Sequence, residues 1–263
     1  MLQTYADETG DAPDPAKHFV GLAGFVGWGN KWKAFDAVWR QICEEESIVL
    51  PFHMADFAAC SAQFKPWKGD EVRRQRALDR LVTAILDADV CPIGAIVSKD
   101  DFDSLNADQR ERLGGNPYYV AFQEITHQMA FCGALQSLRG DIRTGEITPI
   151  PMFYAKKNKY TGKAIGCWEG IKEANLYGAW MGSFTPAEMI EQTPLQAADL
   201  WAYELGHHFE CILPENRPWR YAHKRIVTHA LRMGGGHRFF ELCTRKFMLG
   251  MLGELEEEDN LAL

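Results

Sequence analysis

Short apolar segments alternate with longer amphipathic segments along most of this chain of 263 residues. The short segments are rich in β-branched, aromatic and glycine residues, which favours buried strands; they cover residues 2–7, 18–28, 90–98 and 147–155. The longer segments repeat apolar residues with helical spacing; they cover residues 31–46, 71–89, 116–138, 161–174 and 193–210. Strands separated by helices pair in parallel through right-handed crossovers. This order predicts an α/β fold with a central sheet flanked by helices.

The first two predicted strands have no helix between them. A Pro-rich turn, APDPAK at 12–17, joins them, so we expect an antiparallel hairpin that makes the sheet mixed. The long helix of residues 116–138 has Asn116 as its expected N-cap and Pro117 at its first position, both typical of helix starts. No break in composition divides the chain, and we expect one domain over residues 1–263 with a helical C-terminal extension at about 212–263.

Composition narrows the class of protein. Hydrophobic residues make up 46% of the chain, enough for a substantial core. The formal net charge of -8 argues against a protein that coats nucleic acid by bulk attraction, although a local basic patch can still bind it. The seven cysteines show no zinc-type spacing, the N-terminus has no signal pattern, and the longest apolar run, 19–29, has about half the length of a bilayer span. We therefore expect a soluble, cytoplasmic protein with reduced thiols and no membrane partner.

Three acidic side chains, Asp7, Glu8 and Asp11, lie close together in TYADETGD at the end of the first predicted strand. Unpaired charge at the end of a buried strand is costly. One explanation is turn chemistry, with Asp7 capping the turn at Gly10; the other is a binding role. Neighbouring side chains of a regular strand point to opposite faces, so Asp7 and Glu8 share a site only if the strand ends or twists between them, which Gly10 permits.

A second acidic position lies in the predicted helix 193–210, for which Thr193 is the expected N-cap. At about 100° per residue, one broad apolar face comprises Leu195, Ala198, Trp201, Ala202, Leu205 and Phe209. Asp199 borders this face, level with the small residues Ala202 and Gly206, whereas a solvated carboxylate would lie opposite it. Burying a carboxylate there is costly unless a cation or a strong donor compensates. A salt bridge or a cap for a neighbouring loop would also explain the position.

The two acidic segments belong to longer motifs. YADETGD near the N-terminus and PLQAADLWAYE in the late helix, together with FHMADF (52–57) and, more weakly, FYAKKNKYTGKA (153–164), resemble segments of the bacterial and phage domain-of-unknown-function family 3800. The resemblance covers roughly residues 2–210. That family is similar to the ribonuclease H-like fold group, which implies a central mixed sheet with helices on both sides.

The resemblance also implies a metal site. In that fold group, carboxylates of the first strand and of a late helix meet at the sheet's edge and hold divalent metal, and Asp7 and Asp199 match these positions. Mg²⁺ or Mn²⁺ suits such oxygen ligands, and two ions can activate water and stabilise the leaving oxygen in phosphodiester cleavage. Glu8 is a candidate third ligand. His53 and Asp56 lie one helical turn apart, with His53 as a possible proton carrier and Asp56 as a further acid; a core-edge histidine and an N-cap aspartate are the alternative.

One departure from the family's pattern concerns the strand that ends at Tyr154 and Ala155. The fold group commonly has an acid at the end of a further central strand, but here KKNKY follows. The metal site is then either incomplete or completed by Glu8, His53 or Asp56.

The basic residues of that turn form a second kind of candidate site. Lys156, Lys157 and Lys159, with Tyr160, have the chemistry to grip phosphate and stack a base; a solvated turn is the alternative. The resemblance, together with these features, implies a metal-dependent phosphodiester hydrolase, a nuclease with a DNA or RNA substrate. A non-catalytic nucleic-acid- or protein-binding module on the same fold is the alternative. A glycoside hydrolase with paired carboxylates is a weaker option, since no sugar-stacking feature is present.

Overall fold

The computed structural model describes residues 1–10, 14, 16–138, 147–156, 161–174, 178–232 and 240–254, except for the side chains of 135–138, 161 and 163. The strands are β1 (Leu2–Thr9), β2 (Phe19–Trp28), β3 (Cys91–Ser98), β4 (Ile150–Ala155), β5 (Met181–Ala187) and β6 (Phe240–Cys243). The α-helices are α1 (Gly29–Glu45), α2 (Met54–Ala59), α3 (Glu71–Asp87), α4 (Lys99–Asp103), α5 (Ala107–Arg112), α6 (Pro117–Leu138), α7 (Thr161–Ala174), α8 (Pro194–His207), α9 (Tyr221–Arg232) and α10 (Arg245–Leu252). Short 3₁₀-helices span Ala62–Trp67 and Gly178–Trp180, and a π-helical turn spans His208–Ile212.

The strands of the described chain form one mixed sheet in the order β5-β4-β1-β2-β3-β6. β2 is antiparallel to both of its neighbours, β1 and β3. The other neighbouring pairs, β1 with β4, β4 with β5 and β3 with β6, are parallel. The predicted α/β class, the mixed sheet and the opening hairpin are confirmed. β1 lies in the interior of the sheet, so both of its edges are paired with neighbouring strands.

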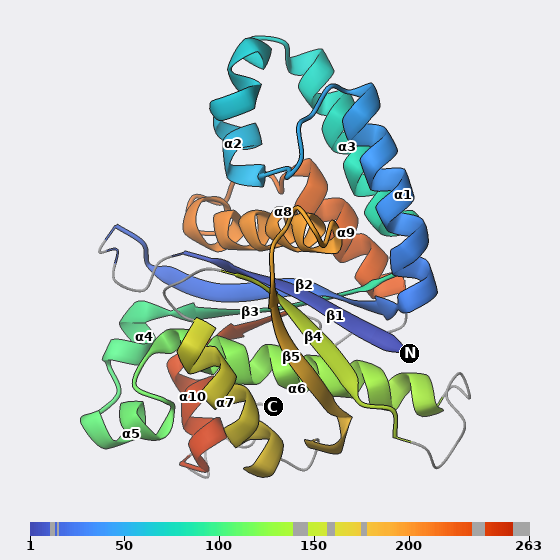
Figure 1. Cartoon of the computed structure of the whole chain (residues 1–263). Coiled ribbons are helices and arrows are strands. Elements are labelled where there is room, and N and C mark those ends of the chain that lie inside the picture. The colour runs from blue at the N-terminus through green and yellow to red at the C-terminus, as the bar shows by residue number, and fades with distance from the viewer. Residues whose placement is uncertain are drawn as a thin grey trace.

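Helices cover the sheet on both sides (Figure 1). α8 and α9 lie on one face, and α1, α2 and α3 rise beyond them, away from the sheet. α6 lies across the opposite face, with α7 and α10 on the same side. Two buried clusters follow this division, one on the α8 face and one on the α6 face.

Alternation along β1 assigns its side chains to the two faces. Tyr5 belongs to the cluster on the α8 face, where its ring stacks on that of Phe153 at 4.9 Å between centroids. Leu2 and Ala6 belong to the cluster on the α6 face. A strand turns successive side chains to opposite faces, so the position after Ala6 returns to the α8 face.

The structure differs from the sequence expectation in two strands. β5 was absent from the expected elements because MGSFTPA combines glycine, serine and proline, which are poor strand formers; it is tolerated at the sheet's edge. β6 is only four residues long and lies within the segment 212–263 that we expected to be helical. The C-terminal segment therefore contributes the other edge of the sheet as well as helices.

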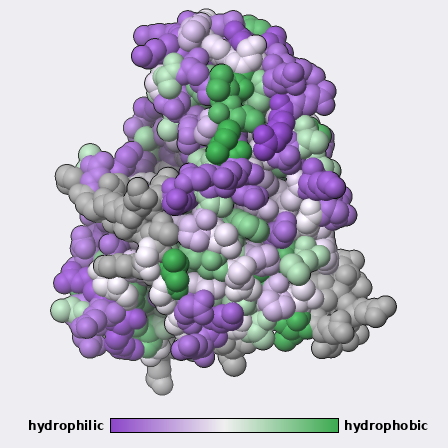
Figure 2. Space-filling model, viewed as in Figure 1, coloured by the Kyte–Doolittle hydropathy of each residue, from purple (hydrophilic) through white to green (hydrophobic). Residues whose placement is uncertain are grey.

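The surface of the part formed by α1, α2 and α3 is largely hydrophilic in the view of Figure 2. In the described part of the chain, no helix is both long and apolar enough to cross a membrane. The seven cysteines are free thiols.

Candidate functional site

Asp7 lies within the central strand β1. Its main chain pairs with Ala23 of β2, and its side chain is fully buried, with 0% relative exposure. Its Oδ1 accepts a hydrogen bond from the main-chain N–H of Glu8 at 2.7 Å. Aspartate is seldom fully buried, and buried charges are usually paired or coordinate a metal. Asp7 therefore marks this part of the sheet as a candidate site.

Helix α8 crosses the same face of the sheet and packs on β1 and β2. Gly206 approaches Thr9 so closely that a Cβ on residue 206 would stand 2.2 Å from the Thr9 Oγ1 atom. Near the start of the helix, Pro194 lines one hollow together with Tyr5. The helix therefore runs along β1 in the direction from Tyr5 to Thr9, and Asp7 lies between these two residues in the strand.

Asp199 lies on the side of α8 that faces β1. It precedes Gly206 by two helical turns, which leaves the two positions about 20° apart around the helix axis. Asp7 precedes Thr9 by two residues and therefore shares its face of the strand. Because Gly206 approaches Thr9, the fold directs Asp7 and Asp199 to one interface between strand and helix.

The Asp199 carboxylate also caps a helix. Its Oδ2 accepts the main-chain N–H of Met54, the first residue of α2, at 2.7 Å. One turn earlier, Gln196 Oε1 accepts the main-chain N–H of Phe52 at 2.9 Å. These two bonds hold residues 52–54 against α8. The cap for a neighbouring segment, one of the alternatives for Asp199, is therefore present, and it brings the main chain of His53 beside Asp199.

The two polar residues of FHMADF have different surroundings. His53 is the N-cap residue of α2, is half-buried, and makes no capping bond with its side chain. Asp56 lies in the first turn of α2 rather than at its N-cap, and its Oδ1 accepts the hydroxyl of Ser61 at 2.6 Å. Asp56 therefore ties down the turn that follows α2, whereas His53 lies next to the segment held by Asp199.

Glu8 points to the other face of the sheet. Its Oε2 accepts the hydroxyl of Tyr154 at 2.9 Å, and the Tyr154 oxygen accepts the hydroxyl of Tyr118 at 2.7 Å. Burial raises the pKa of both phenols. β1 is regular through both acids, so the twist that would bring Glu8 beside Asp7 does not occur. The structure therefore does not bring Glu8 to the interface of Asp7 and Asp199.

The predicted basic turn is described only at its start. Lys156 follows β4, and its Nζ lies 3.2 Å from Oε1 of Glu188 in an exposed ion pair. Exposed pairs of this kind contribute little to stability, and the lysine remains reachable from solvent. Lys157 and Lys159 lie outside the described residues, as does Asp11 of the N-terminal acidic cluster.

The donor set suits one hard cation better than two. Within the described ranges, no group of three or more His, Cys, Asp or Glu side chains is arranged as metal ligands would be. Asp7 and Asp199 offer two carboxylates to one interface. Mg²⁺ keeps several waters and is commonly bound by one or two carboxylates. Two ions would bring four positive charges, which a single pair of carboxylates does not balance.

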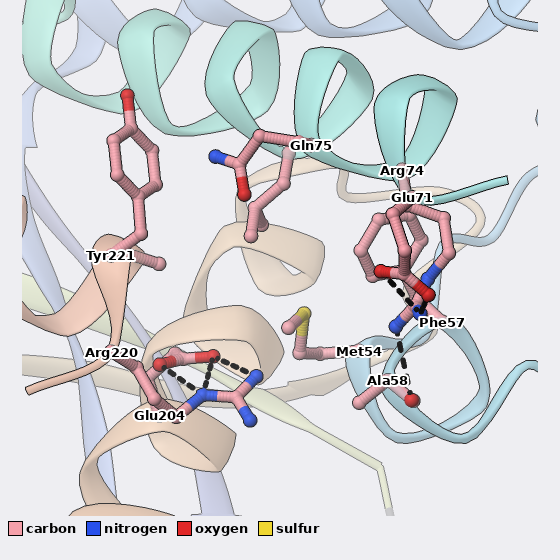
Figure 3. Close-up of a pocket in the computed structure, with 11 residues that line it drawn as sticks. Met54, Phe57, Ala58, Glu71, Arg74, Gln75, Glu204, Arg220 and Tyr221 are labelled. Atoms are coloured by element: carbon pink, nitrogen blue, oxygen red, sulfur yellow. Dashed lines mark hydrogen bonds and ion pairs between the residues drawn. The ribbon is translucent and has the colours of Figure 1, made fainter. Parts of the chain in front are cut away.

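A separate cavity of about 210 Å³ lies among α2, α3, α8 and α9 (Figure 3). Two arginines line it, and each is paired with a carboxylate: Arg74 with Glu71 at 2.9 Å, and Arg220 with Glu204 at 2.8 Å. Burial raises the pKa of Glu204, and Arg220 opposes that rise. The charges of these four side chains are therefore balanced within the protein.

Tyr203 and His207 were not among the site residues expected from the sequence. All other residues of α8 are buried, but Asp199, Tyr203 and His207, spaced by four, are half-buried and form one stripe along the helix. The spacing is visible in the sequence. It is obscured there because apolar residues surround it on both sides.

Comparison of the chain with protein-family models, with curated proteins and with solved structures finds no match. The resemblance to the domain-of-unknown-function family 3800 therefore rests on its motifs and stays a prediction. What the site does has to be inferred from its own residues.

Proposed function

We propose that the protein is a metal-dependent phosphodiester hydrolase, a nuclease acting on DNA or RNA, in which Asp7 and Asp199 hold one Mg²⁺ or Mn²⁺ ion. The packing of α8 on β1 supports this, because it turns two aspartates from distant parts of the chain toward one interface. The motif resemblance points to the same two residues. We place the protein in the cytoplasm, since free thiols such as its seven cysteines persist in a reducing compartment.

The chain's own residues would prepare the site for this reaction. When bound, the cation would polarise a phosphoryl oxygen and lower the pKa of a coordinated water. Asp7, buried in the strand, provides fixed negative charge, and the half-buried Asp199 provides the charge nearer to solvent. The N–H of Met54 orients the Asp199 carboxylate. The imidazole of His53 is the group that would accept or deliver a proton.

The test uses replacements that remove charge but keep shape. Asp7→Asn and Asp199→Asn retain an acceptor oxygen, so the N–H of Met54 keeps its partner and the fold is preserved. With Mn²⁺ and labelled single- and double-stranded DNA and RNA, each variant should cleave at least ~100-fold more slowly than the parent. Asp87→Asn, an exposed position on α3, is the matched control and should cleave at the parental rate. Equal cleavage by the parent and both site variants would refute the proposal.

Cation binding can be measured without activity. A ligand that binds only the folded state raises the Tm, so Mn²⁺ should raise the Tm of the parent and of Asp87→Asn. Asp199→Asn should show a much smaller rise. Because this readout does not require a substrate, it applies even if the natural nucleic acid differs from those assayed.

A non-catalytic binding module is the second candidate, and one contact favours it. The hydrogen bond from Met54 to Asp199 gives this carboxylate a structural role as the cap of α2. If capping is its whole role, Mn²⁺ leaves the Tm unchanged, and Asp199→Asn behaves as the parent in every assay. Asp199→Ala alone then lowers stability, by about 1 kcal/mol, as loss of a helix cap does.

A further inference from the structure

A small cavity opens beside the candidate metal pair, at the end of β1. Its volume is about 120 Å³, and it lies among the ends of β1, β2 and α8. Thr9 lines it, two residues beyond Asp7, which is about 7 Å along a strand. Tyr203 and His207 also line it, one and two turns beyond Asp199 on the half-buried stripe of α8. The cavity is therefore the next hollow along the same interface of strand and helix.

Three cationic side chains lie near His207. Burial lowers the pKa of this imidazole, and Arg220, Lys17 and Arg217 lower it further, in that order. His207 is thus neutral near pH 7 and has one ring N–H to donate. The two arginines are engaged in ion pairs with carboxylates of their own. Lys17 is exposed and lines the cavity itself, so its charge is available to a ligand there.

Glu210 also lines the cavity and would oppose an anion, but it is already engaged. Its Oε1 accepts the main-chain N–H groups of His18 and Phe19 at 2.9 and 2.8 Å. These two donors hold the carboxylate against the start of β2 and stabilise it there. The cavity therefore combines a cationic lysine with the neutral donors of an imidazole and the Thr9 hydroxyl.

The size of the cavity limits its ligand. Sites for drug-sized molecules usually exceed about 300 Å³, whereas this cavity has about 120 Å³. A tetrahedral oxyanion fits such a space, while a ribose with its base does not. Lysine and neutral N–H and O–H donors are the groups with which proteins bind phosphate oxygens.

We propose that this cavity binds a phosphate group of the nucleic acid. This phosphate is the neighbour, along the nucleic-acid backbone, of the phosphate held at Asp7 and Asp199. Lys17 provides the charge, and His207 and Thr9 provide hydrogen-bond donors. The inference rests on the proposed function, because the neighbouring phosphate is the one to be cleaved. Contacts to phosphate position a strand without reading its sequence, so the site would set where the strand is cut and not which base is chosen.

The test measures strand binding without cleavage. Fluorescence anisotropy of a fluorescein-labelled oligothymidylate and oligouridylate is recorded with EDTA present, for the parent, Lys17→Gln and His207→Phe. Each variant should raise the Kd roughly 3- to 10-fold. Lys17→Gln should also reduce the slope of log Kd against log salt by about 1. Lys68→Gln, an exposed lysine that follows the 3₁₀-helix Ala62–Trp67, is the control and should bind as the parent does.

Two results would overturn the inference. One is parental affinity and salt slope in both cavity variants. The other is a cavity that takes only a free anion: inorganic phosphate raises the Tm of the parent but not of Lys17→Gln, yet does not displace the strand. Displacement of the strand by phosphate in the parent, and weaker displacement in Lys17→Gln, supports it.

The failure of this inference can be told from failure of the proposed function. If Asp7→Asn loses cleavage while Lys17→Gln binds the strand as the parent does, only the proposed phosphate site is refuted. If Lys17→Gln binds the strand more weakly while Asp7→Asn and Asp199→Asn cleave as the parent does, the nuclease proposal is refuted and the strand-binding cavity remains.

Discussion

Asp7 and Glu8 are neighbours in the sequence, but they belong to different layers of the molecule. On the α8 face, Asp7 lies buried at an interface to which α8 directs Asp199. On the α6 face, Glu8 receives a hydrogen bond at the end of a chain of two phenols. The α8 face gathers acidic groups from distant segments, whereas the polar groups of the α6 face bond to one another. The side chains of two adjacent acids thus have different surroundings, because they point to opposite faces of the sheet.

The largest expected difference between the two faces is in catalysis. Asp7→Asn should reduce Mn²⁺-dependent cleavage at least ~100-fold, because it removes charge from the proposed cation site. Glu8→Gln keeps an acceptor for Tyr154 and should leave the rate within about twofold, because the sheet separates it from that site. Steady-state cleavage of one labelled strand by both variants makes the comparison. A large loss in Glu8→Gln would show that both faces serve one site.

The second prediction concerns the close approach of α8 and β1. Gly206→Ala places a Cβ against Thr9 and should lower the free energy of unfolding by about 2–3 kcal/mol, since overpacking forces the helix off the strand. Urea unfolding measures it. Gly170→Ala on α7 has open space around the added atom and should be neutral or stabilising by up to about 1 kcal/mol, as alanine is the better helix former. Partial recovery in Gly206→Ala combined with Thr9→Ala would confirm that the contact is the cause; the absence of any loss in Gly206→Ala would contradict it.

The pH dependence of stability should also differ between the two faces, with an effect slightly smaller than that of Gly206→Ala. On the α8 face, His208 and His223 stack with ring centroids 4.2 Å apart, and burial lowers the pKa of both, that of His223 from 6.5 to about 3. A pKa that is lower in the folded state favours the neutral form, so this stability is complete above pH 6.5 and is lost as pH falls toward 3. Between pH 7.5 and 5, protonation of His223 in the unfolded state should lower the free energy of unfolding of the protein by about 2 kcal/mol.

The other titratable groups near the stacked rings do not reverse this sign. Arg220 lowers the pKa of His223 further. A hydrogen bond that involves the main chain raises this pKa at Glu204, whose carboxylate is paired with Arg220. Unfolding in urea at the two pH values, for the parent and His223→Phe, measures the effect; an equal pH dependence in both would contradict it. On the α6 face, the raised pKa values of Tyr118 and Tyr154 predict a loss of stability only above pH 10.

The smallest predicted effect isolates the phenol chain. Tyr154→Phe removes the hydroxyl between Tyr118 and Glu8 and should lower stability by about 1 kcal/mol, because the buried Tyr118 and the half-buried Glu8 each lose a hydrogen bond. Cleavage should not change. Unfolding and cleavage measured on one preparation test both statements, and a stable variant with impaired cleavage would link the α6 face to the chemistry.

The sequence predicted those elements whose own composition specifies them. Strands with long apolar runs, such as β2 and β3, and helices with clear periodicity, such as α3, lie close to their expected bounds. β5 and β6 were missed because edge strands require little intrinsic preference when the sheet supplies their partners. The expected N-cap Thr193 makes no capping bond; its φ of -58° is already helical, and its hydroxyl donates to Asp36 instead.

Candidate site residues could be predicted where a single sequence segment contained the motif. The motifs identified Asp7 and Asp199, and strand alternation already indicated that Glu8 faces away from Asp7. The cap of α2 was not predictable, because the Met54 N–H that Asp199 accepts lies 145 residues away in the chain. The cavity beside Thr9 was missed for a similar reason: Lys17 and His207 meet there only once the hairpin and the end of α8 have packed together.

The hydrogen bond between Met54 and Asp199 couples the position of the first three helices to ligand binding at the interface of α8 and β1. A ligand that draws this carboxylate toward β1 weakens the anchor of α2, and a shift of α2 releases the carboxylate. Linkage makes the two effects equal in size. The angle at which α1, α2 and α3 stand over the sheet would then report on occupancy of the interface, so a pair of fluorophores across α2 and α8 could follow binding with no substrate present.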